Sequence, residues 1–175
     1  NLIKDRAVIN MEFYRPGLPG LLQTGAEICI NVGQSRTWFN DRYRNDTWLP
    51  DQNYEEGFYG HISGEYQRHW PGMKAWEGIR EGTGHNIYGT DRDPVFQTFL
   101  ENVGEYRIEV PEGEYELSLL FAEPREDTGR VFSVWVNGRQ CIDRLNPGSD
   151  YGSYRAIVKK FRVKAEDNGL SIRLE

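Results

Sequence analysis

Residues 114–121 read EYELSLLF, and this stretch decides the fold class of the chain. Tyr115, Leu117, Leu119 and Phe121 alternate with Glu116, Ser118 and Leu120. A period of two places every second side chain on the same face of a β-strand. The stretch therefore predicts a strand with one apolar face turned toward a core.

The sequence that follows this strand predicts a β-hairpin. Residues 130–145 read RVFSVWVNGRQCIDRL, in which Phe132, Val134 and Val136 share one face of a strand. The next two residues are Asn-Gly, the dipeptide that best tolerates the positive φ angles of a type I′ turn between antiparallel strands. We therefore expect a tight hairpin with Cys141 on its return strand.

Other short apolar stretches, bounded by turn residues, predict further strands. Three of them are YRIEV at 106–110, AIVKKFRV at 156–163 and LSIRL at 170–174. Upstream, the nearly continuous apolar run EICINVG at 27–33 predicts a central strand buried on both faces. Because short strands separated by turns are typical of an antiparallel β-sandwich, we expect an all-β fold.

The length of 175 residues fits one domain with a core of its own. We expect residues 26–175 to form this domain and residues 1–25, which contain RPGLPGLLQTG, to be a linker or peripheral segment. The uncharged apolar runs reach only about five residues, against the roughly 20 that a transmembrane helix needs. No membrane partner is expected.

The composition argues against several other kinds of partner. The net charge is −6, and Lys and Arg occur as singles or pairs, whereas nucleic-acid binding needs a concentrated positive surface. Cys29 and Cys141 are too few for a disulfide framework or a thiolate zinc site. The three histidines have spacings that match no metal-site pattern. We expect no nucleic-acid partner, no metal and no cofactor.

An aromatic-rich stretch without hydrophobic periodicity occupies residues 47–76. It holds seven aromatic side chains in thirty positions, namely Trp48, Tyr54, Phe58, Tyr59, Tyr66, Trp70 and Trp76. A flat aromatic face can stack on the apolar face of a sugar while polar neighbours bind its hydroxyls. Two interpretations stay open: these rings bind a glycan, or they anchor long loops to the core of the sandwich.

Catalysis by this chain is the weaker hypothesis. A glycosidase needs two carboxylates roughly 5 to 10 Å apart across a cleft, and with 27 acidic residues some pair will be close by chance. Glu123 stands out because it follows a predicted buried strand, where a carboxylate must be paired or exposed. We expect it to bond to backbone or to an arginine, and we predict no catalytic residue.

Five sequence blocks occur in the order that is seen in malectin-like domains. They are INVG at 30–33, WLPD at 48–51, GTDRDPVFQT at 89–98, YRIEVPEGEYELSLLFAE at 106–123 and RVFSVWVNG at 130–138. From about residue 28 to its end the chain resembles the malectin family, also classed as carbohydrate-binding module family 57. In particular, it is similar to the copies appended to bacterial glycoside hydrolase family 2 enzymes, many of them β-galactosidases.

The resemblance implies a galactose-binding-like jelly roll with long aromatic-rich loops, in which loop aromatics and an aspartate hold the sugar. Trp48 falls where malectin has a sugar-contacting tyrosine, and Tyr66 is the counterpart of a second one. Asn146 stands where malectin has its sugar-binding aspartate. The loop FLENVG at 99–104 is shorter than the malectin loop and lacks its aromatic pair, so the diglucoside specificity of malectin is not expected.

We therefore predict a non-catalytic carbohydrate-binding domain of a bacterial glycosidase, located in the periplasm or outside the cell. Its candidate sugar-binding residues are ring faces and polar neighbours, namely Trp48, Asp51, Tyr66, Trp70, Trp76, Asp91, Arg92 and Asn146. The expected partners are a neutral glycan or oligosaccharide and the catalytic domain of the parent enzyme. The alternative is a structural module that docks on that catalytic domain without binding free sugar.

Overall fold

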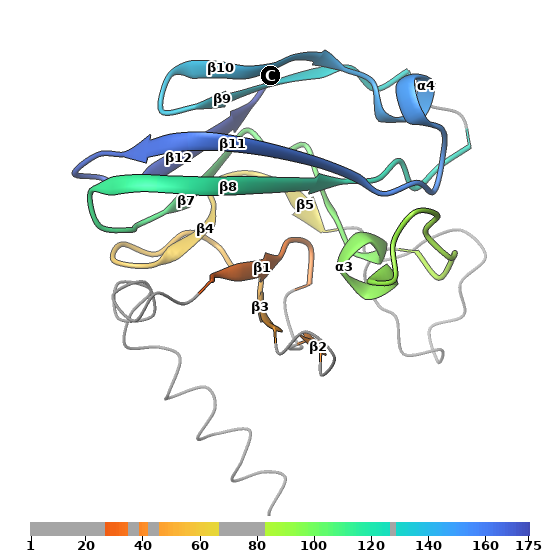
Figure 1. The fold of residues 1–175 in the computed structure, drawn as a ribbon, viewed down its shortest axis with the longest axis horizontal. Helices are drawn as coiled ribbons and strands as arrows, with labels where there is room; N and C mark the ends of the chain where they lie inside the picture. The colour runs from red at the N-terminus through yellow and green to blue at the C-terminus, as the bar shows by residue number, and fades with distance from the viewer. Residues whose placement is uncertain (1–26, 35–38, 42–45, 67–82, 127–128) are drawn as a thin grey trace, which may run out of the picture.

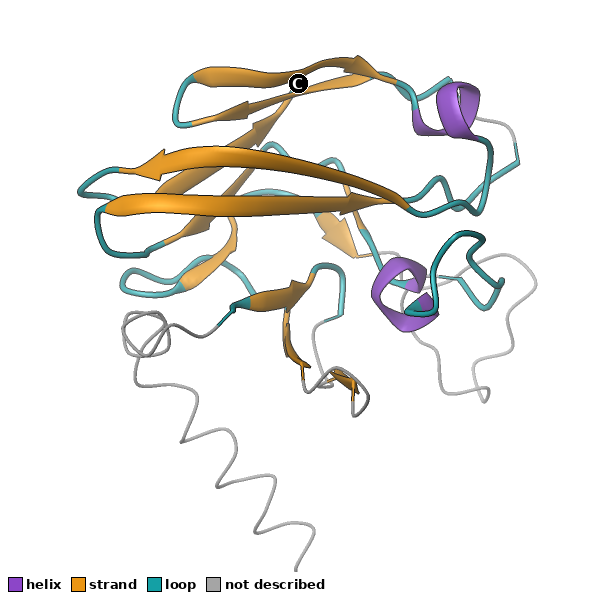
Figure 2. Ribbon diagram, viewed as in Figure 1, coloured by secondary structure: helices purple, strands orange, loops and turns teal. Residues whose placement is uncertain are grey.

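The computed structural model describes residues 27–34, 39–41, 46–66, 83–126 and 129–175. Most of these residues lie in or between β-strands, with two short helices at one end of the domain (Figure 2). The larger sheet and the longest strand pair enclose an apolar core, so the predicted all-β sandwich is confirmed. None of the helices in the described ranges is long and apolar enough to cross a bilayer. The predicted linker at residues 1–25 lies outside the described residues.

The larger sheet has five antiparallel strands in the order β10-β9-β12-β7-β4. Its strands are β4 (Tyr59–His61), β7 (Glu105–Ile108), β9 (Phe132–Val136), β10 (Arg139–Leu145) and β12 (Leu170–Leu174). The last strand, β12, lies between β7 and β9. The sheet therefore joins segments that are far apart in the sequence.

The predicted hairpin is formed by β9 and β10. Asn137 and Gly138 have φ angles of 46° and 77°, both in the positive region that a type I′ turn requires. The Asn137 side chain also accepts a hydrogen bond from the Ser171 backbone N–H (2.8 Å) and donates one to the Gly169 carbonyl (3.1 Å). This asparagine therefore both shapes the turn and ties it to the turn before β12.

The two longest strands are β8 (Gly113–Phe121) and β11 (Ile157–Ala165), which run side by side in Figure 1. They pair antiparallel without interruption, from Ile157 opposite Phe121 to Ala165 opposite Gly113. The alternation in EYELSLLF therefore predicted a strand correctly. In the part of the chain that the structure describes, each of these two strands pairs only with the other.

The first half of the chain forms shorter strands, and here the prediction was partly wrong. β1 (Cys29–Asn31) pairs parallel with β3 (Asp46–Pro50), which pairs antiparallel with β2 (Phe39–Asp41). EICINVG therefore yields a three-residue strand at the edge of a sheet, because the chain turns at Gly33 with φ of +88°. A further small sheet joins β5 (Glu65–Tyr66) to β6 (Leu100–Glu101). Strands this short are too brief to show a period of two.

Each of the two short helices begins with a proline in its first turn. They are α3 (Asp93–Gln97) and α4 (Pro147–Tyr151). Proline fits the first turn of a helix because the N–H groups there have no partner within the helix. Five residues are too few to carry a helical stripe, so the sequence pattern did not predict them.

The main core lies between the five-stranded sheet and the β8–β11 pair. Val134 and Val136 are almost completely buried, which confirms the predicted inner face of the hairpin. A second, smaller cluster contains Cys29, Trp48, Ile87, Val95 and Phe96. Cys29 and Cys141 are both free thiols.

Candidate functional site

Asp51, at the end of the WLPD block, is the centre of a buried polar network. The residue is only 2% exposed. Its Oδ2 accepts a hydrogen bond from the Gly33 N–H, and its Oδ1 accepts from the Tyr106 hydroxyl and the Gln52 N–H, each at 2.9 Å. The Nδ1 atom of His61 lies 3.3 Å from Oδ1. The predicted role of Asp51 as a sugar ligand is therefore wrong, because its oxygens are used inside the protein.

A second buried contact connects two other sequence blocks. Thr98 donates its hydroxyl hydrogen to the Asn31 side-chain oxygen at 2.9 Å, and both residues are buried. Together with Gly33, Asp51 and Tyr106, this contact joins four of the five blocks on which the family resemblance rests. Residues of those blocks therefore form buried polar contacts in the interior of the fold.

Trp48 is also buried, with 6% of its surface exposed. Its ring lies in the smaller core cluster, and the guanidinium carbon of Arg92 is 5.8 Å from the ring centroid. The indole Nε1 has no hydrogen-bond partner among the described residues. Stacking on a sugar needs a bare ring face, so the sequence-based role of Trp48 is corrected to core packing.

The remaining predicted site residues are dispersed. Asp91 is exposed and Arg92 half-buried, both just before α3, so these two lie together. The Asn146 side-chain oxygen accepts a hydrogen bond from the Ser149 N–H and caps α4. For Tyr66 the structure describes only the backbone of β5, and the predictions for Trp70 and Trp76 lie outside the described residues.

The most exposed aromatic side chain among the large apolar residues described belongs to Tyr88, at 65% exposure. Two backbone hydrogen bonds hold it in place: its N–H donates to the Tyr154 carbonyl at 2.7 Å, and its carbonyl accepts from the Ala156 N–H at 2.9 Å. The His85 ring lies 4.6 Å from the Tyr154 ring, tilted by 35°. We call His85, Tyr88 and Tyr154 the aromatic platform.

Polar residues are close to the aromatic platform along the chain. Asn86 and Asp91 are exposed, and Arg155, also exposed, forms a parallel β-bridge with Tyr88. Burial, followed by the negative charges of Glu126 and Glu123, raises the pKa of the Tyr154 hydroxyl above the ordinary tyrosine value. The segments around Tyr88 and Tyr154 thus carry aromatic rings together with neutral and charged hydrogen-bonding residues.

Sequence reasoning missed the aromatic platform for two reasons. The segment GTGHNIYG at 82–89 is rich in glycine but lacks the lysine and hydroxyl residue that end a phosphate-binding loop, so its pattern indicates no ligand site. In addition, the segment at 154–156 that holds Tyr88 is distant in sequence, and nothing near Tyr88 indicates this pairing.

A family model for the malectin domain matches residues 26–175. The chain belongs to the malectin domain family. This malectin domain is similar to part of a Bacteroides uniformis β-glucuronidase, with 29% identity and a TM-score of 0.74 over 87% of this chain and 16% of that chain. It is also similar to Bacteroides uniformis β-glucuronidase 2 bound covalently to cyclophellitol-6-carboxylate aziridine, with 30% identity and a TM-score of 0.71 over 87% and 16% of the two chains.

More distant similarity extends to the plant protein FER, solved in complex with the peptide RALF23 and LLG2. There the identity is 16% and the TM-score 0.52, over 85% of this chain and 42% of that one, which shows a shared fold alone. No curated protein sequence matches the chain significantly. The malectin domain thus corresponds to about one sixth of the glucuronidase chains that it resembles.

Glu123 of the malectin domain is a buried structural carboxylate, with 1% of its surface exposed. Its Oε1 accepts a hydrogen bond from the Arg125 N–H at 3.1 Å, and its Oε2 lies 3.5 Å from the Arg130 Nε. Arg130 also pairs with Glu101. The predicted bonding of Glu123 to backbone and arginine is confirmed. In the described ranges, no cluster of three or more His, Cys, Asp or Glu side chains could hold a metal ion.

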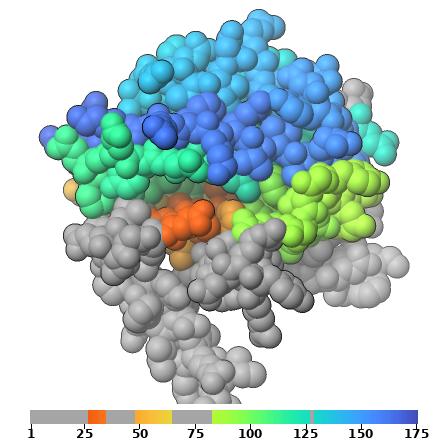
Figure 3. Space-filling model, viewed as in Figure 1, coloured from red at the N-terminus to blue at the C-terminus, as the bar shows by residue number. Residues whose placement is uncertain are grey.

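The malectin domain contains a large apolar cavity of about 1250 Å³ that is partly open to solvent. Its walls include β1, β8 and the inner face of the five-stranded sheet, and in Figure 3 β1 (orange) emerges next to β8 (green) on the surface. This cavity explains why Leu117, Leu119 and Phe121 are only half-buried although they form the predicted inner face.

The cavity is partly open to solvent, so its apolar walls contact water unless another group covers them. Removing apolar surface from water contributes roughly 25 cal/mol per Å² to stability. An occupant with apolar groups would therefore be favoured over water.

Tyr59 makes the stability of the malectin domain sensitive to alkaline pH. Burial, followed by the negative charge of Asp51, raises the pKa of Tyr59, whose hydroxyl donates to the Pro50 carbonyl at 2.8 Å. The folded state therefore holds this proton more tightly than the unfolded state, where tyrosine has a pKa of about 10. The contribution to stability is complete below about pH 10 and decreases as the pH rises above it.

We expect the free energy of unfolding, measured by urea titration between pH 8 and 11, to fall at the alkaline end. In Tyr59→Phe this fall should be smaller, since the titrating hydroxyl is gone. Tyr151→Phe, which changes a more exposed tyrosine, should retain the pH dependence of the original chain. An unchanged alkaline slope in Tyr59→Phe would contradict the assignment.

Proposed function

We propose that this malectin domain is a non-catalytic carbohydrate-binding domain and that it binds a neutral glycan on the aromatic platform. The observation that carries the proposal is Tyr88, which is 65% exposed yet held by two backbone hydrogen bonds. A ring on an ordered backbone loses little conformational freedom when a ligand binds. Sugars offer an apolar ring face for such a surface.

The neighbours of Tyr88 supply the polar part of the proposed site. Arg155 pairs with Tyr88 through the backbone, and the exposed side chain of Asn86 comes from the same segment as Tyr88. Guanidinium and amide groups can bind sugar hydroxyls that lie in the plane of the ring. Asp91, predicted from the sequence, is exposed three residues after Tyr88 and would extend the proposed polar rim.

We further propose that the malectin domain is an accessory part of a larger glycosidase. The support is its similarity to a segment of Bacteroides uniformis β-glucuronidases, in which the matching region is 16% of the chain. A parent enzyme of the β-galactosidase type and a periplasmic or extracellular location belong to the same proposal. In this proposal the rest of the enzyme carries out the chemical step, and the malectin domain binds the glycan and so keeps the enzyme near it.

Glycan binding can be tested by isothermal titration calorimetry with galactose- and glucose-containing oligosaccharides. We expect Tyr88→Ala to weaken binding by roughly tenfold, because aromatic contacts contribute up to about 1.5 kcal/mol. Tyr151→Ala is the matched control: this tyrosine is 39% exposed on α4, where its hydroxyl bonds to Lys159. The affinity of Tyr151→Ala for the oligosaccharide should stay within about twofold of the affinity of the unmodified domain.

Two results would reject this assignment. One is the absence of heat at millimolar oligosaccharide, and the other is an equal loss of affinity in Tyr88→Ala and Tyr151→Ala. A loss confined to Tyr88→Ala, with unchanged thermal unfolding, would locate the glycan on the aromatic platform.

Docking on the catalytic domain is the second candidate function, and the partly open apolar cavity favours it. The two functions differ in their effect on an enzyme that contains the malectin domain. If the domain docks, deleting it should reduce turnover of a small soluble substrate. If it only binds glycan, deletion should reduce activity on polymeric substrates alone.

A further inference from the structure

We propose that Glu123 is a positioning residue of the candidate glycan site and holds Tyr88 in place through the backbone of Tyr154. Its effect on glycan binding rests on the proposed function. The link from Glu123 to Tyr88 rests only on hydrogen bonds within the domain, so it can be tested without a glycan.

Tyr154 is the middle of this link. Its backbone N–H donates to the Glu123 carbonyl at 2.7 Å, and its own carbonyl accepts from the Tyr88 N–H, also at 2.7 Å. Glu123 follows the end of β8, whereas Tyr88 belongs to the segment before α3, so the two are distant along the chain. A shift of the Glu123 carbonyl therefore reaches Tyr88 across two hydrogen bonds.

The backbone of Tyr154 is strained. Its φ angle is +55°, in the left-handed region that a bulky aromatic residue rarely adopts. Such a conformation persists only where the surroundings hold it, and it is concentrated at functional sites. The two backbone hydrogen bonds hold it here, and the Tyr154 ring packs against the smaller core cluster and the His85 ring. The conformation of Tyr154 therefore depends on its partners, of which the Glu123 carbonyl is one.

Sequence and side-chain contacts both fix the backbone of Glu123. Pro124 follows it, and a residue before proline is confined to extended conformations. The buried Glu123 carboxylate accepts a hydrogen bond from the Arg125 N–H and lies 3.5 Å from the Arg130 Nε. Because this side chain bonds to the N–H two residues further on, the carboxylate and the backbone of Glu123 move together. The carboxylate thus helps to set the direction of the carbonyl that Tyr154 uses.

A second carboxylate connects this network to another sheet. Glu101, the last residue of β6, pairs with the guanidinium groups of both Arg125 (3.0 Å) and Arg130. β6 is paired with β5 and is not part of the β8–β11 pair. The arginines around Glu123 are therefore held from outside their own loop, which restricts the movement of Glu123 further.

The first test measures amide hydrogen exchange of the 175-residue chain without glycan. Glu123→Gln keeps the size of the side chain and removes its charge. We expect the Tyr88 and Tyr154 amides to exchange roughly tenfold faster in this variant, because a charge-assisted contact that supports their hydrogen bonds is lost. Val134→Ala, which truncates a completely buried side chain of β9, lowers global stability only and should leave both rates unchanged.

The second test is a double-mutant cycle on glycan affinity. If Glu123 acts through Tyr88, Glu123→Gln should weaken oligosaccharide binding by roughly fivefold in the original domain. In Tyr88→Ala the same change should weaken it by less than about twofold, because the ring that Glu123 positions is already gone. A carboxylate with a merely structural role would have the same effect in both backgrounds.

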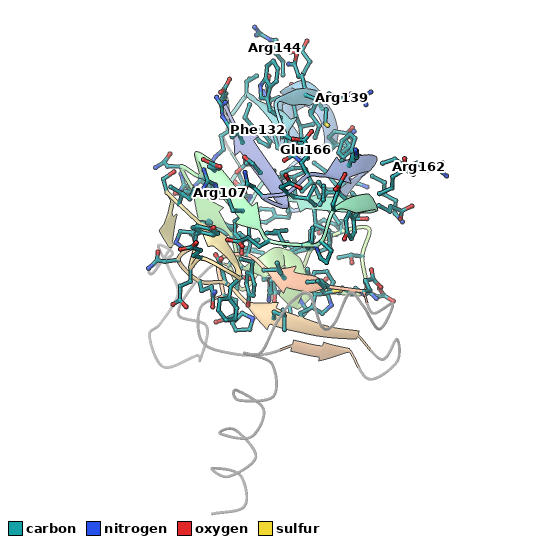
Figure 4. All side chains as sticks on the ribbon, turned by 90° about the vertical axis from the view of Figure 1, so that its left-hand side faces the viewer. Arg107, Phe132, Arg139, Arg144, Arg162 and Glu166 are labelled. Carbon is teal, nitrogen blue, oxygen red and sulfur yellow. The ribbon has the colours of Figure 1, made fainter. Side chains whose placement is uncertain are left out.

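Arg130→Met keeps the test decisive if Glu123→Gln does not fold. It removes the guanidinium next to the Glu123 carboxylate but retains an apolar stem, and it should also accelerate exchange of the Tyr88 amide. Arg162→Met is the matched control. Arg162 is exposed on β11 and projects into solvent (Figure 4), so exchange of the Tyr88 amide should not change.

Two results would overturn the proposal. The first is a Tyr88 exchange rate that is unchanged in Glu123→Gln, or that rises equally in Val134→Ala. The second is an additive effect of Glu123→Gln and Tyr88→Ala on glycan affinity. If the original domain binds no glycan at all, the proposed function is rejected together with the role of Glu123 in binding, and the exchange rates decide separately whether Glu123 holds Tyr88.

Discussion

Replacing Asp51 with alanine is expected to destabilise the malectin domain by about 3–5 kcal/mol, the cost of removing one partner from a buried charged network. The substitution leaves the Gly33 N–H and the Tyr106 hydroxyl without their acceptor in a region closed to water. For a domain of this size, a loss of 1 kcal/mol lowers the melting temperature by about 2–4 °C, so we expect a decrease of roughly 6–20 °C. Chemical and thermal unfolding both measure it.

Two variants make the Asp51 result specific. Asp143→Ala removes an exposed aspartate of β10, so its effect should stay within about 0.5 kcal/mol. Tyr106→Phe removes one donor of the network, and combined with Asp51→Ala it should cost less than the sum of the two single changes. Strict additivity, or a loss below about 1 kcal/mol in Asp51→Ala, would mean that the network does not hold the fold together.

The burial of Asp51 shows why its role could not be read from the sequence. Its partners Gly33 and Tyr106 are distant along the chain, and a carboxylate in a loop-like stretch looks the same whether it faces a ligand or a buried amide. The same ambiguity applies to Trp48. An aromatic residue without periodic neighbours gives no indication of which side of it is covered.

The second half of the chain was predictable for the opposite reason. The strands β8, β9 and β11 are five to nine residues long, so each contains at least two full periods of alternation. The turn between β9 and β10 depends on two adjacent residues, Asn137 and Gly138, and is encoded locally. Sequence reasoning therefore succeeded where structure depends on neighbours in the chain, and it failed at β1, β3 and the aromatic platform, which depend on distant pairings.

Replacing Gly33 with alanine is the second change from which we expect a large effect, about 2–5 kcal/mol of destabilisation. Gly33 has a φ angle of +88°, in which an L-residue is strained by roughly 1–2 kcal/mol. A Cβ atom there would also lie only 2.4 Å from the backbone N and C atoms of Phe99. Backbone cannot rotate away as a side chain can, so overpacking adds about 1–3 kcal/mol.

Gly57→Ala separates these two contributions. Gly57 has nearly the same φ angle, +85°, but a Cβ atom there would meet nothing within 4 Å. Its substitution should therefore cost only the strain of roughly 1–2 kcal/mol, and the difference between the two variants in urea unfolding measures the contact with Phe99. Equal losses would show that the chain around Phe99 moves aside at no cost. A larger loss of unfolding free energy in Gly33→Ala would give a physical reason why INVG and GTDRDPVFQT occur together. Gly33 ends the first block, and its missing side chain allows the backbone of Phe99, which follows the second block, to come close.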